Sequence, residues 1–272
     1  MAFRNTHLFK QNLSAFTRHY ETESYNKKSI SVPQSTKRSM SNTNNYKPLK
    51  TTPPTTMAAY DVDDFSIVYR LCSSVKKEED WDDIRVFLRS NPTEVTKACA
   101  EYQGELETSS LHVACKNNPP LDVIQALYEA SPEAVEWIDA FVWLPLHYAA
   151  ANGASAEVLS FLTNADPTSK VAVDKRGRTP LHFAVGTLDR QASKEVVEIL
   201  SDSGAARCAD ENGSLPIHYA CAYSSSVEVL KVLVEAVPQS SSSIDFNGCT
   251  PLHFAVSASY FGSNSLRFAH FY

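Results

Sequence analysis

From residue 104 onward, apolar positions recur along the chain at a nearly constant interval. Each unit contains an apolar residue followed by histidine, and these histidines lie 35, 35, 36 and 35 residues apart: His112, His147, His182, His218 and His253. A second apolar run with helical spacing opens eleven residues after three of them and fourteen residues after His182. A period of this length predicts units that stack side by side and share one continuous core.

The residues around each histidine predict the start of a helix. Thr179 is placed to cap the unpaired N–H groups, and Pro180 takes the first helical position, where no N–H is needed. Leu144 and Leu215 stand where Thr179 stands and cannot cap with a side-chain oxygen, at a cost of about 1 kcal/mol each. In three units, Asp followed three residues later by Gly predicts a tight turn ahead of the helix: 174–177, 210–213 and 245–248.

Each unit therefore reads turn, helix, loop, helix, and the stretches GRTPLHFAV, GSLPIHYAC and GCTPLHFAV resemble the ankyrin-repeat signature. The resemblance covers roughly residues 104–256. It implies an all-α solenoid of stacked helix-loop-helix units with turn or hairpin fingers. The period is about two residues longer than the usual one, and the additional length lies between the second helix and the next turn. The His182 unit also carries three extra residues between its helices, in GTLDRQASKE, and a shorter following loop, SGAARCAD.

We expect three parts in the chain. Residues 1–57 form a tail, residues 58–103 an N-terminal capping unit with helices in FSIVYRLCSSV and WDDIRVFLRSNP, and residues 104–272 the repeats. The repeat boundaries are placed at 104–138, 139–173, 174–209, 210–244 and 245–272, the last repeat being partial. The final stretch NSLRFAHFY is either a shortened helix that folds back as a cap or the place where a longer protein has been cut.

The tail and the body carry opposite charge. Residues 1–57 hold nine Lys or Arg and two Asp or Glu, a net +7, whereas the remaining residues have a net −13, which gives the total of −6. The tail is rich in Ser, Thr, Asn, Lys and Pro and is expected to be disordered. Its first 20 residues are basic, acid-poor and amphipathic, as in an organelle transit peptide, although an ordinary basic tail with a chance apolar stripe fits as well.

Composition excludes several classes of function. The acidic body argues against nucleic acid as the main ligand, and no run of about 18 apolar residues predicts a membrane span. None of the six cysteines forms a C-x-x-C pair, which favours a reduced, intracellular location, cytoplasmic or nuclear, with organelle import through residues 1–20 as the alternative. We expect a monomer with neither a cofactor nor a small-molecule substrate.

The five histidines suggest metal binding at first sight, but their spacing argues against it. Stacked helices lie about 8–10 Å apart, so one histidine per unit does not bring several nitrogens within about 2 Å of one ion. Each imidazole is instead expected to bond to nearby backbone, as the resemblance also implies. Cys115 and Cys221 are read as small buried side chains, while Cys249, beside a turn, is the candidate reactive thiol.

The resemblance implies that a protein partner binds along a concave face made of turn tips and first helices. Phe141, Trp143, Tyr223 and Phe246 are the aromatic candidates for anchoring it. Alternatively, Phe141 and Trp143 pack against a neighbouring loop, because their turn lacks its Gly. Carried over by position, the candidate contact residues are Lys116, Asn117, Phe141, Trp143, Asn152, Lys175, Arg176, Thr187, Glu211, Asn212, Tyr223, Phe246 and Asn247.

Two functions are compatible with this pattern. The first is a non-catalytic adaptor or scaffold that binds another protein through the concave face. The alternative is the regulatory ankyrin segment of a larger enzyme or channel. Fold alone does not choose between them.

Overall fold

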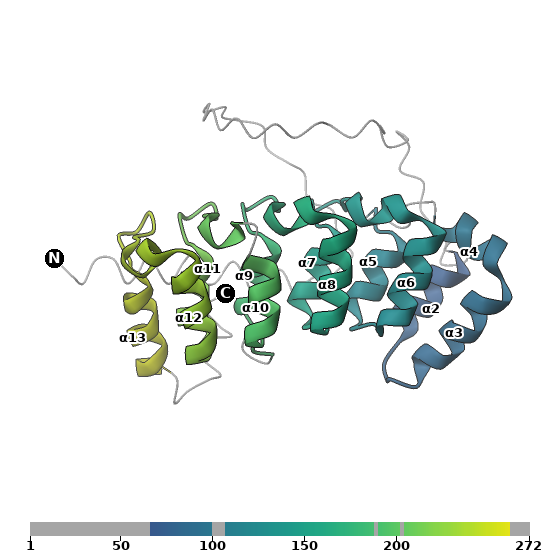
Figure 1. The fold of residues 1–272 in the computed structure, drawn as a ribbon, viewed down its shortest axis with the longest axis horizontal. Helices are drawn as coiled ribbons and strands as arrows, with labels where there is room; N and C mark the ends of the chain where they lie inside the picture. The colour runs from purple at the N-terminus through teal and green to yellow at the C-terminus, as the bar shows by residue number, and fades with distance from the viewer. Residues whose placement is uncertain (1–65, 100–106, 188–189, 202–203, 262–272) are drawn as a thin grey trace, which may run out of the picture. The chain divides into compact units, whose positions relative to one another are not determined.

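The computed structural model describes residues 66–99, 107–187, 190–201 and 204–261. Within these ranges the chain forms helices in the order that the period predicts, and the all-α repeat fold is confirmed (Figure 1). The expected disordered tail, the transit-peptide hypothesis for residues 1–20 and the C-terminal stretch NSLRFAHFY lie outside the described residues.

Each repeat contributes one inner and one outer helix. The inner helices pack in a row, each against the next: α5 (Ser110–Lys116), α7 (Pro145–Ala151), α9 (Pro180–Val185), α11 (Pro216–Ala222) and α13 (Pro251–Phe261). The outer helices form a parallel row in front of them in Figure 1: α6 (Leu121–Ala130), α8 (Ala156–Ala165), α10 (Lys194–Ser201) and α12 (Val227–Ala236). In the described part of the last repeat, α13 has no outer helix beside it.

The additional length of each repeat forms a 3-10 helix after the outer helix. In three repeats a proline opens it, since proline ends the α-helix but fits the first position of a new helical turn: η2 (Pro132–Glu136), η3 (Pro167–Val171) and η5 (Pro238–Ser242). In the His182 repeat, Gly204 at φ 92° precedes a three-residue helix instead, η4 (Ala205–Arg207). The shorter loop of this repeat is therefore a shorter 3-10 helix.

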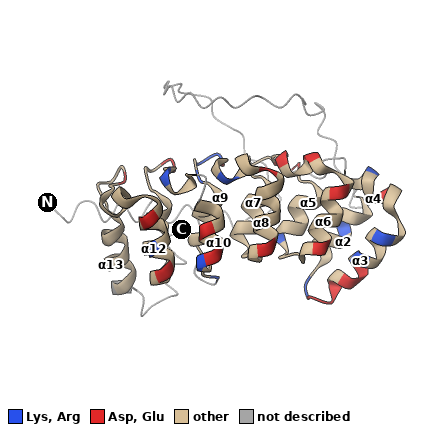
Figure 2. Ribbon diagram, viewed as in Figure 1, with Lys and Arg blue, Asp and Glu red and all other residues tan. Residues whose placement is uncertain are grey.

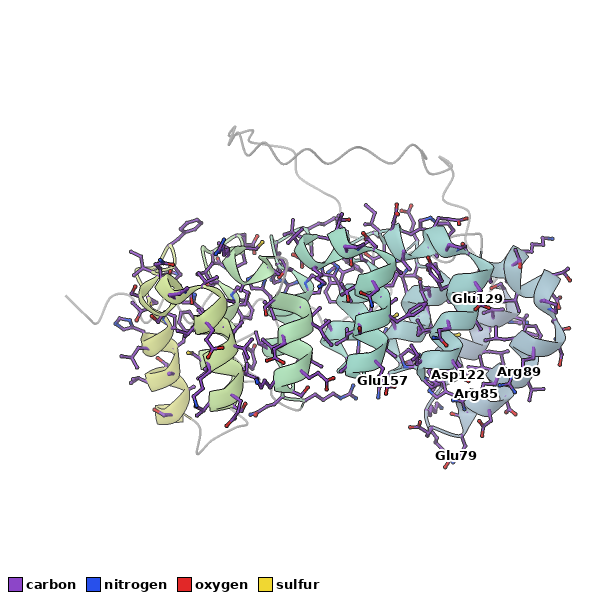
Figure 3. All side chains as sticks on the ribbon, viewed as in Figure 1. Glu79, Arg85, Arg89, Asp122, Glu129 and Glu157 are labelled. Atoms are coloured by element: carbon purple, nitrogen blue, oxygen red, sulfur yellow. The ribbon has the colours of Figure 1, made fainter. Side chains whose placement is uncertain are left out.

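Residues 66–99 at the N-terminal end form three helices, one more than the two predicted. Helices α2 (Ile67–Ser74) and α3 (Asp80–Ser90) lie in the two predicted stretches. The sequence pattern placed the end of the unit's last helix at Pro92, but Pro92 opens a further helix, α4 (Pro92–Cys99). Arg85 of α3 joins this end to α6: its Nε and Nη2 donate to the Asp122 carboxylate at 2.6 and 3.0 Å (Figure 3).

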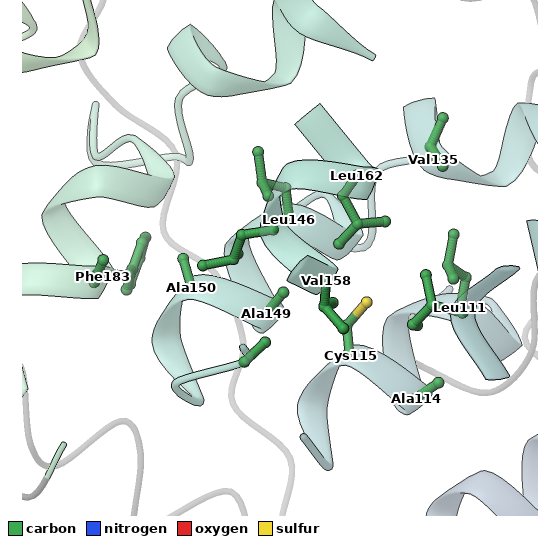
Figure 4. Close-up of a cluster of buried hydrophobic side chains, with 14 of the residues drawn as sticks. Leu111, Ala114, Cys115, Val135, Leu146, Ala149, Ala150, Val158, Leu162 and Phe183 are labelled. Atoms are coloured by element: carbon green, nitrogen blue, oxygen red, sulfur yellow. The ribbon is translucent and has the colours of Figure 1, made fainter. Parts of the chain in front are cut away.

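One apolar core runs between the two rows of helices. Leu111, Leu146 and Val158 are among its fully covered side chains (Figure 4). The alanine two residues after each of the first four histidines is at most 3% exposed, which allows close approach of neighbouring helices. Leu252 of α13 is 69% exposed, whereas its equivalents in the other repeats are nearly inaccessible. Leu252 is exposed because, in the described part of the last repeat, no outer helix lies beside α13.

Candidate functional site

Four turns project ahead of the inner helices, and we call them fingers 1 to 4: residues 139–143, 174–178, 210–214 and 245–249. Each begins with a buried aspartate that holds the turn closed. In finger 2 the Asp174 carboxylate accepts the N–H groups of Arg176 and Arg178 at 2.9 and 2.8 Å, and Gly177 donates its N–H to the Asp174 carbonyl. The predicted Asp-to-Gly turn is therefore confirmed.

Finger 1 adopts the same turn without glycine. Val142 occupies the position of Gly177, Gly213 and Gly248, and it takes the left-handed backbone conformation at φ 66°. A β-branched residue reaches this region only at a cost, because its Cβ approaches the carbonyl oxygen. The sequence shows that the glycine is missing from this turn. It does not show that the valine adopts the left-handed backbone conformation that glycine has in the other fingers. Finger 1 is the strained finger of the described part of the chain.

This strain is measurable by comparing two substitutions at one position. Val142→Gly should be more stable than Val142→Ala by about 1 kcal/mol, because only glycine relieves the left-handed conformation, although glycine normally destabilises a chain relative to alanine. Urea denaturation of both variants measures the difference. Gly248→Ala is the converse control: its Cβ would meet nothing within 4 Å, so it should lose about 1 kcal/mol through the backbone alone. If Val142→Ala were as stable as Val142→Gly, or more stable, the backbone at position 142 would not be strained.

Neighbouring fingers are joined tip to tip. The N–H of Glu211 donates to the Arg176 carbonyl at 2.7 Å, and the N–H of Phe246 donates to the Asn212 carbonyl at 2.9 Å. Between fingers 1 and 2 a side chain makes the bond: the Lys175 ammonium donates to the Ala140 carbonyl at 2.5 Å. The same ammonium lies 6.0 Å from the centre of the Phe141 ring. The four tips thus form one continuous edge.

Three of the histidines, His112, His182 and His218, tie their inner helix to the next repeat. In the third repeat, the Thr179 N–H donates to His182 Nδ1 at 3.0 Å, so the proton is on Nε2, which lies 3.2 Å from the Ser214 carbonyl of the next finger. His112 bonds in the same way to the N–H of Ser109 and the carbonyl of Trp143. The expected structural role of these imidazoles is confirmed.

The repeats without a Thr or Ser cap keep part of this arrangement. His147 and His218 accept the N–H groups of Leu144 and Leu215, both at 3.0 Å. The Leu144 side chain is itself buried. A hydroxyl is therefore missing at these two helix starts, but the bond from backbone to imidazole is retained.

The candidate contact residues divide into three groups by exposure. Four side chains are exposed: Lys116, Lys175, Glu211 and Phe246. Seven are half-buried: Asn117, Phe141, Asn152, Arg176, Thr187, Asn212 and Asn247. Two are buried, Trp143 at 9% and Tyr223 at 6% exposed. The candidates on the finger tips are therefore accessible to a partner, whereas two of the four aromatic anchors are not.

Trp143 and Tyr223 were misread as surface anchors. The Trp143 ring packs 4.4 Å from the Phe183 ring and 5.0 Å from the Tyr148 ring, centre to centre, so it joins two repeats inside the core. Tyr223 follows the last residue of α11, where its N–H donates to the Tyr219 carbonyl, and its side chain is buried. Trp143 therefore packs against its neighbours, as the alternative interpretation expected.

Three half-buried candidates also have a structural role. Asn117 donates its amide to the Cys72 carbonyl at 2.7 Å and joins the first repeat to α2. Asn152 donates to the Tyr148 carbonyl at 2.9 Å. Thr187 donates its hydroxyl to the Arg190 carbonyl at 2.7 Å. These residues fix the ends of the inner helices, whatever else they contact.

Sequence reasoning missed the purpose of the insertion in the third repeat. Arg190 donates to the Asn152 carbonyl of the second repeat, and Gln191 donates to the Ser224 carbonyl of the fourth repeat at 3.1 Å. The inserted loop therefore spans both neighbours. The only signal in the sequence was its length.

Charge is distributed unevenly between the helices and the fingers. The outer helices begin with exposed carboxylates: Asp122, Glu157, Glu195 and Glu228. Figure 2 colours the acidic residues red along these helices. Acids at this position interact favourably with the helix dipole. Finger 2 presents two cations instead, of which Arg176 lies 3.7 Å from the Glu211 carboxylate and Lys175 points toward finger 1.

The chemistry of the thiols does not favour a nucleophile. Cys115 is completely buried, as expected. Burial raises the pKa of Cys221 and Cys249, and the nearby Asp245 carboxylate raises the pKa of Cys249 further. A reactive cysteine requires a lowered pKa, so the environment of Cys249 disfavours the thiolate that the sequence hypothesis needs.

Among the described residues, no three His, Cys, Asp or Glu side chains come together as ligands for a metal ion. None of the described helices combines the length and the apolar character needed to cross a membrane.

Comparison with known proteins identifies a family for this chain. The family model "Ankyrin repeats (3 copies)" matches residues 111–206 and residues 190–267. The two matches overlap and together span more than half of the chain, including all five histidine units. No curated protein matches the chain.

Proposed function

Since the chain belongs to the ankyrin-repeat family, whose members generally serve as protein–protein interaction modules, we propose that it is a non-catalytic adaptor or scaffold and that its fingers bind the partner. One observation carries this proposal. Lys175, Glu211 and Phe246 occupy the same position in three fingers of the same geometry, and all three are exposed. A constant frame that presents a different side chain at each tip suits recognition of another protein.

The test compares the finger tips with the outer helices. Tagged full-length chain is purified from cells with its bound proteins, which are quantified by mass spectrometry. The finger variant combines Lys175→Glu with Phe246→Ser, and the control combines Glu157→Lys with Glu228→Lys on α8 and α12. We expect the specific partners to fall at least tenfold with the finger variant and to remain with the control.

Both variants alter exposed side chains, so circular dichroism should stay close to that of the wild type. The urea midpoint of the outer-helix control should fall slightly, because two helices lose a favourable carboxylate in their first turn. Loss of the partners from the outer-helix control alone would move the binding face away from the fingers. Equal recovery of every bound protein by all three chains would contradict a role for either surface.

A further inference from the structure

The order of side chains along the finger tips restricts the kind of partner that fits. Finger 1 presents Phe141 and Val142, finger 2 presents Lys175, and finger 4 presents Phe246. Between them, the Glu211 carboxylate of finger 3 lies 3.7 Å from the guanidinium of Arg176 and offsets its charge. Along this edge, finger 1 is therefore apolar and finger 2 is cationic. The charge of finger 3 is paired with Arg176, and finger 4 is apolar.

The apolar ends and the cation are held in place before any partner arrives. The Phe246 ring lies over finger 3 so closely that a Cβ on Gly213 would be 2.7 Å from it, yet the residue is 80% exposed. The Lys175 ammonium is fixed by the Ala140 carbonyl and by the face of the Phe141 ring. Groups already ordered in this way lose little conformational freedom on binding.

The spacing of the tips follows from their backbone bonds. Each finger pairs its own two arms, as the Asp174 N–H does with the Arg178 carbonyl, and then pairs with the next finger through Glu211 and Arg176. Two paired arms per finger, each about 4.8 Å wide, place successive tips about 10 Å apart. An extended peptide advances about 3.3 Å per residue, so about three of its residues pass each finger.

We propose that the fingers bind an extended acidic segment with apolar side chains at both ends. An apolar residue lies on Phe141 and Val142. A carboxylate about two residues away meets the Lys175 ammonium, which lies 6.0 Å from the centre of the Phe141 ring. A second apolar residue about seven residues further lies on Phe246. This inference rests on the proposed function of the fingers and adds the chemistry of the segment that they recognise. A short unfolded stretch of a partner protein has the necessary form.

A library of random 16-residue peptides displayed on phage tests the proposal without a known partner. Panning on the 272-residue chain should enrich peptides with Asp or Glu about two residues from an apolar residue. These peptides should bind Lys175→Glu at least tenfold more weakly, and panning on Lys175→Glu should select Lys or Arg at the same place. Phe246→Ser should remove the preference for the distant apolar residue.

Lys231→Glu is the matched control, because it makes the same change of charge at an exposed lysine on the outer helix α12 rather than on a finger. Binding of the selected peptides should not change in this variant. Enriched peptides that bind Lys175→Glu as well as the wild type would overturn this inference and leave the proposed function standing. A chain that enriches no peptide above the bare support would count against the proposed function, and the inference would fall with it.

Discussion

Lowering the pH from 7.5 to 4.5 should sharply reduce the free energy of unfolding of this chain. His112, His147 and His182 are buried, and burial lowers the pKa of each to about 4, whereas an unfolded histidine has a pKa of about 6.5. The folded state therefore binds fewer protons than the unfolded state between these values. The stability that the neutral histidines contribute is complete above pH 6.5 and is lost as the pH falls toward 4.

The expected loss is large because these three histidines titrate in the same window, and burial lowers the pKa of His218 as well. A shift of this size corresponds to about 2 kcal/mol per histidine at pH 4.5. Geometry adds a reason: protonation turns Nδ1 of His182 into a donor that faces the Thr179 N–H, which now donates to it at 3.0 Å. Urea denaturation followed by circular dichroism at pH 7.5, 6.5, 5.5 and 4.5 measures the slope.

His182→Asn serves as the control for this prediction. Its side-chain oxygen still accepts a backbone N–H but does not titrate, so the variant should lose less stability on acidification, by at most about one third. Carboxylates other than Asp174 and Asp210, whose charges act on His182, are unaffected by the substitution and cancel in the comparison. An unchanged pH slope in His182→Asn would show that the ladder of histidines is not the source of the acid sensitivity.

The sequence predicted those features that depend on hydrogen bonds between residues close together in the chain. The Thr179-Pro180 helix start, the Asp174-to-Gly177 turn and the backbone role of His182 each involve residues within four positions of one another, apart from the bond that His182 makes to the next finger. Such contacts require certain residue types at fixed spacing, and this spacing recurs in successive repeats. The stacking of units follows from that period, and the all-α class follows from the resemblance to ankyrin repeats.

The side chains whose environment depends on the next repeat were harder to predict. Trp143 and Phe246 both lie on fingers, yet Trp143 is covered by Phe183 from the following repeat and Phe246 is exposed. They lie four and seven residues before the histidine of their repeat, but the sequence alone does not show which of these two positions is covered by the next repeat. The bonds of Arg190 and Gln191 to the repeats on either side have no counterpart elsewhere in the described ranges and therefore left no pattern to read.

The buried aspartates of the fingers show a substitution pattern that can be tested directly. Tyr148 and Tyr219 donate their hydroxyls to Asp139 and Asp210 at 2.7 and 2.8 Å. The third repeat has Phe183 in the tyrosine position, and there Arg178 takes over. Its Nε and Nη2 donate to Asp174 Oδ2 at 2.9 and 2.7 Å, and its guanidinium carbon lies 4.4 Å from the centre of the Phe183 ring.

Arg178→Ser should therefore lower the free energy of unfolding by about 3 kcal/mol, because it leaves a buried carboxylate without its charged partner. The side chains of Arg178 and Asp174 are only 10% and 2% exposed, so water does not replace the lost bonds. Adding Phe183→Tyr should restore at least half of the loss, since the doubly substituted third repeat would then carry the same serine and tyrosine pair as the fourth repeat, Ser214 and Tyr219.

The rescue separates the polar bond from simple packing. Phe183→Tyr alone adds a hydroxyl where Arg178 already satisfies Asp174 and should be neutral or destabilising, and Tyr219→Phe should cost about 1–3 kcal/mol because Asp210 loses its donor. Urea midpoints of these variants and the wild type measure the differences. If Arg178→Ser with Phe183→Tyr were no more stable than Arg178→Ser, a tyrosine hydroxyl could not replace the guanidinium, and the repeats would satisfy their aspartates by unrelated means. If the stability returns, either donor is sufficient. The finger then stays closed whichever donor it uses, and its tip residues are free to differ.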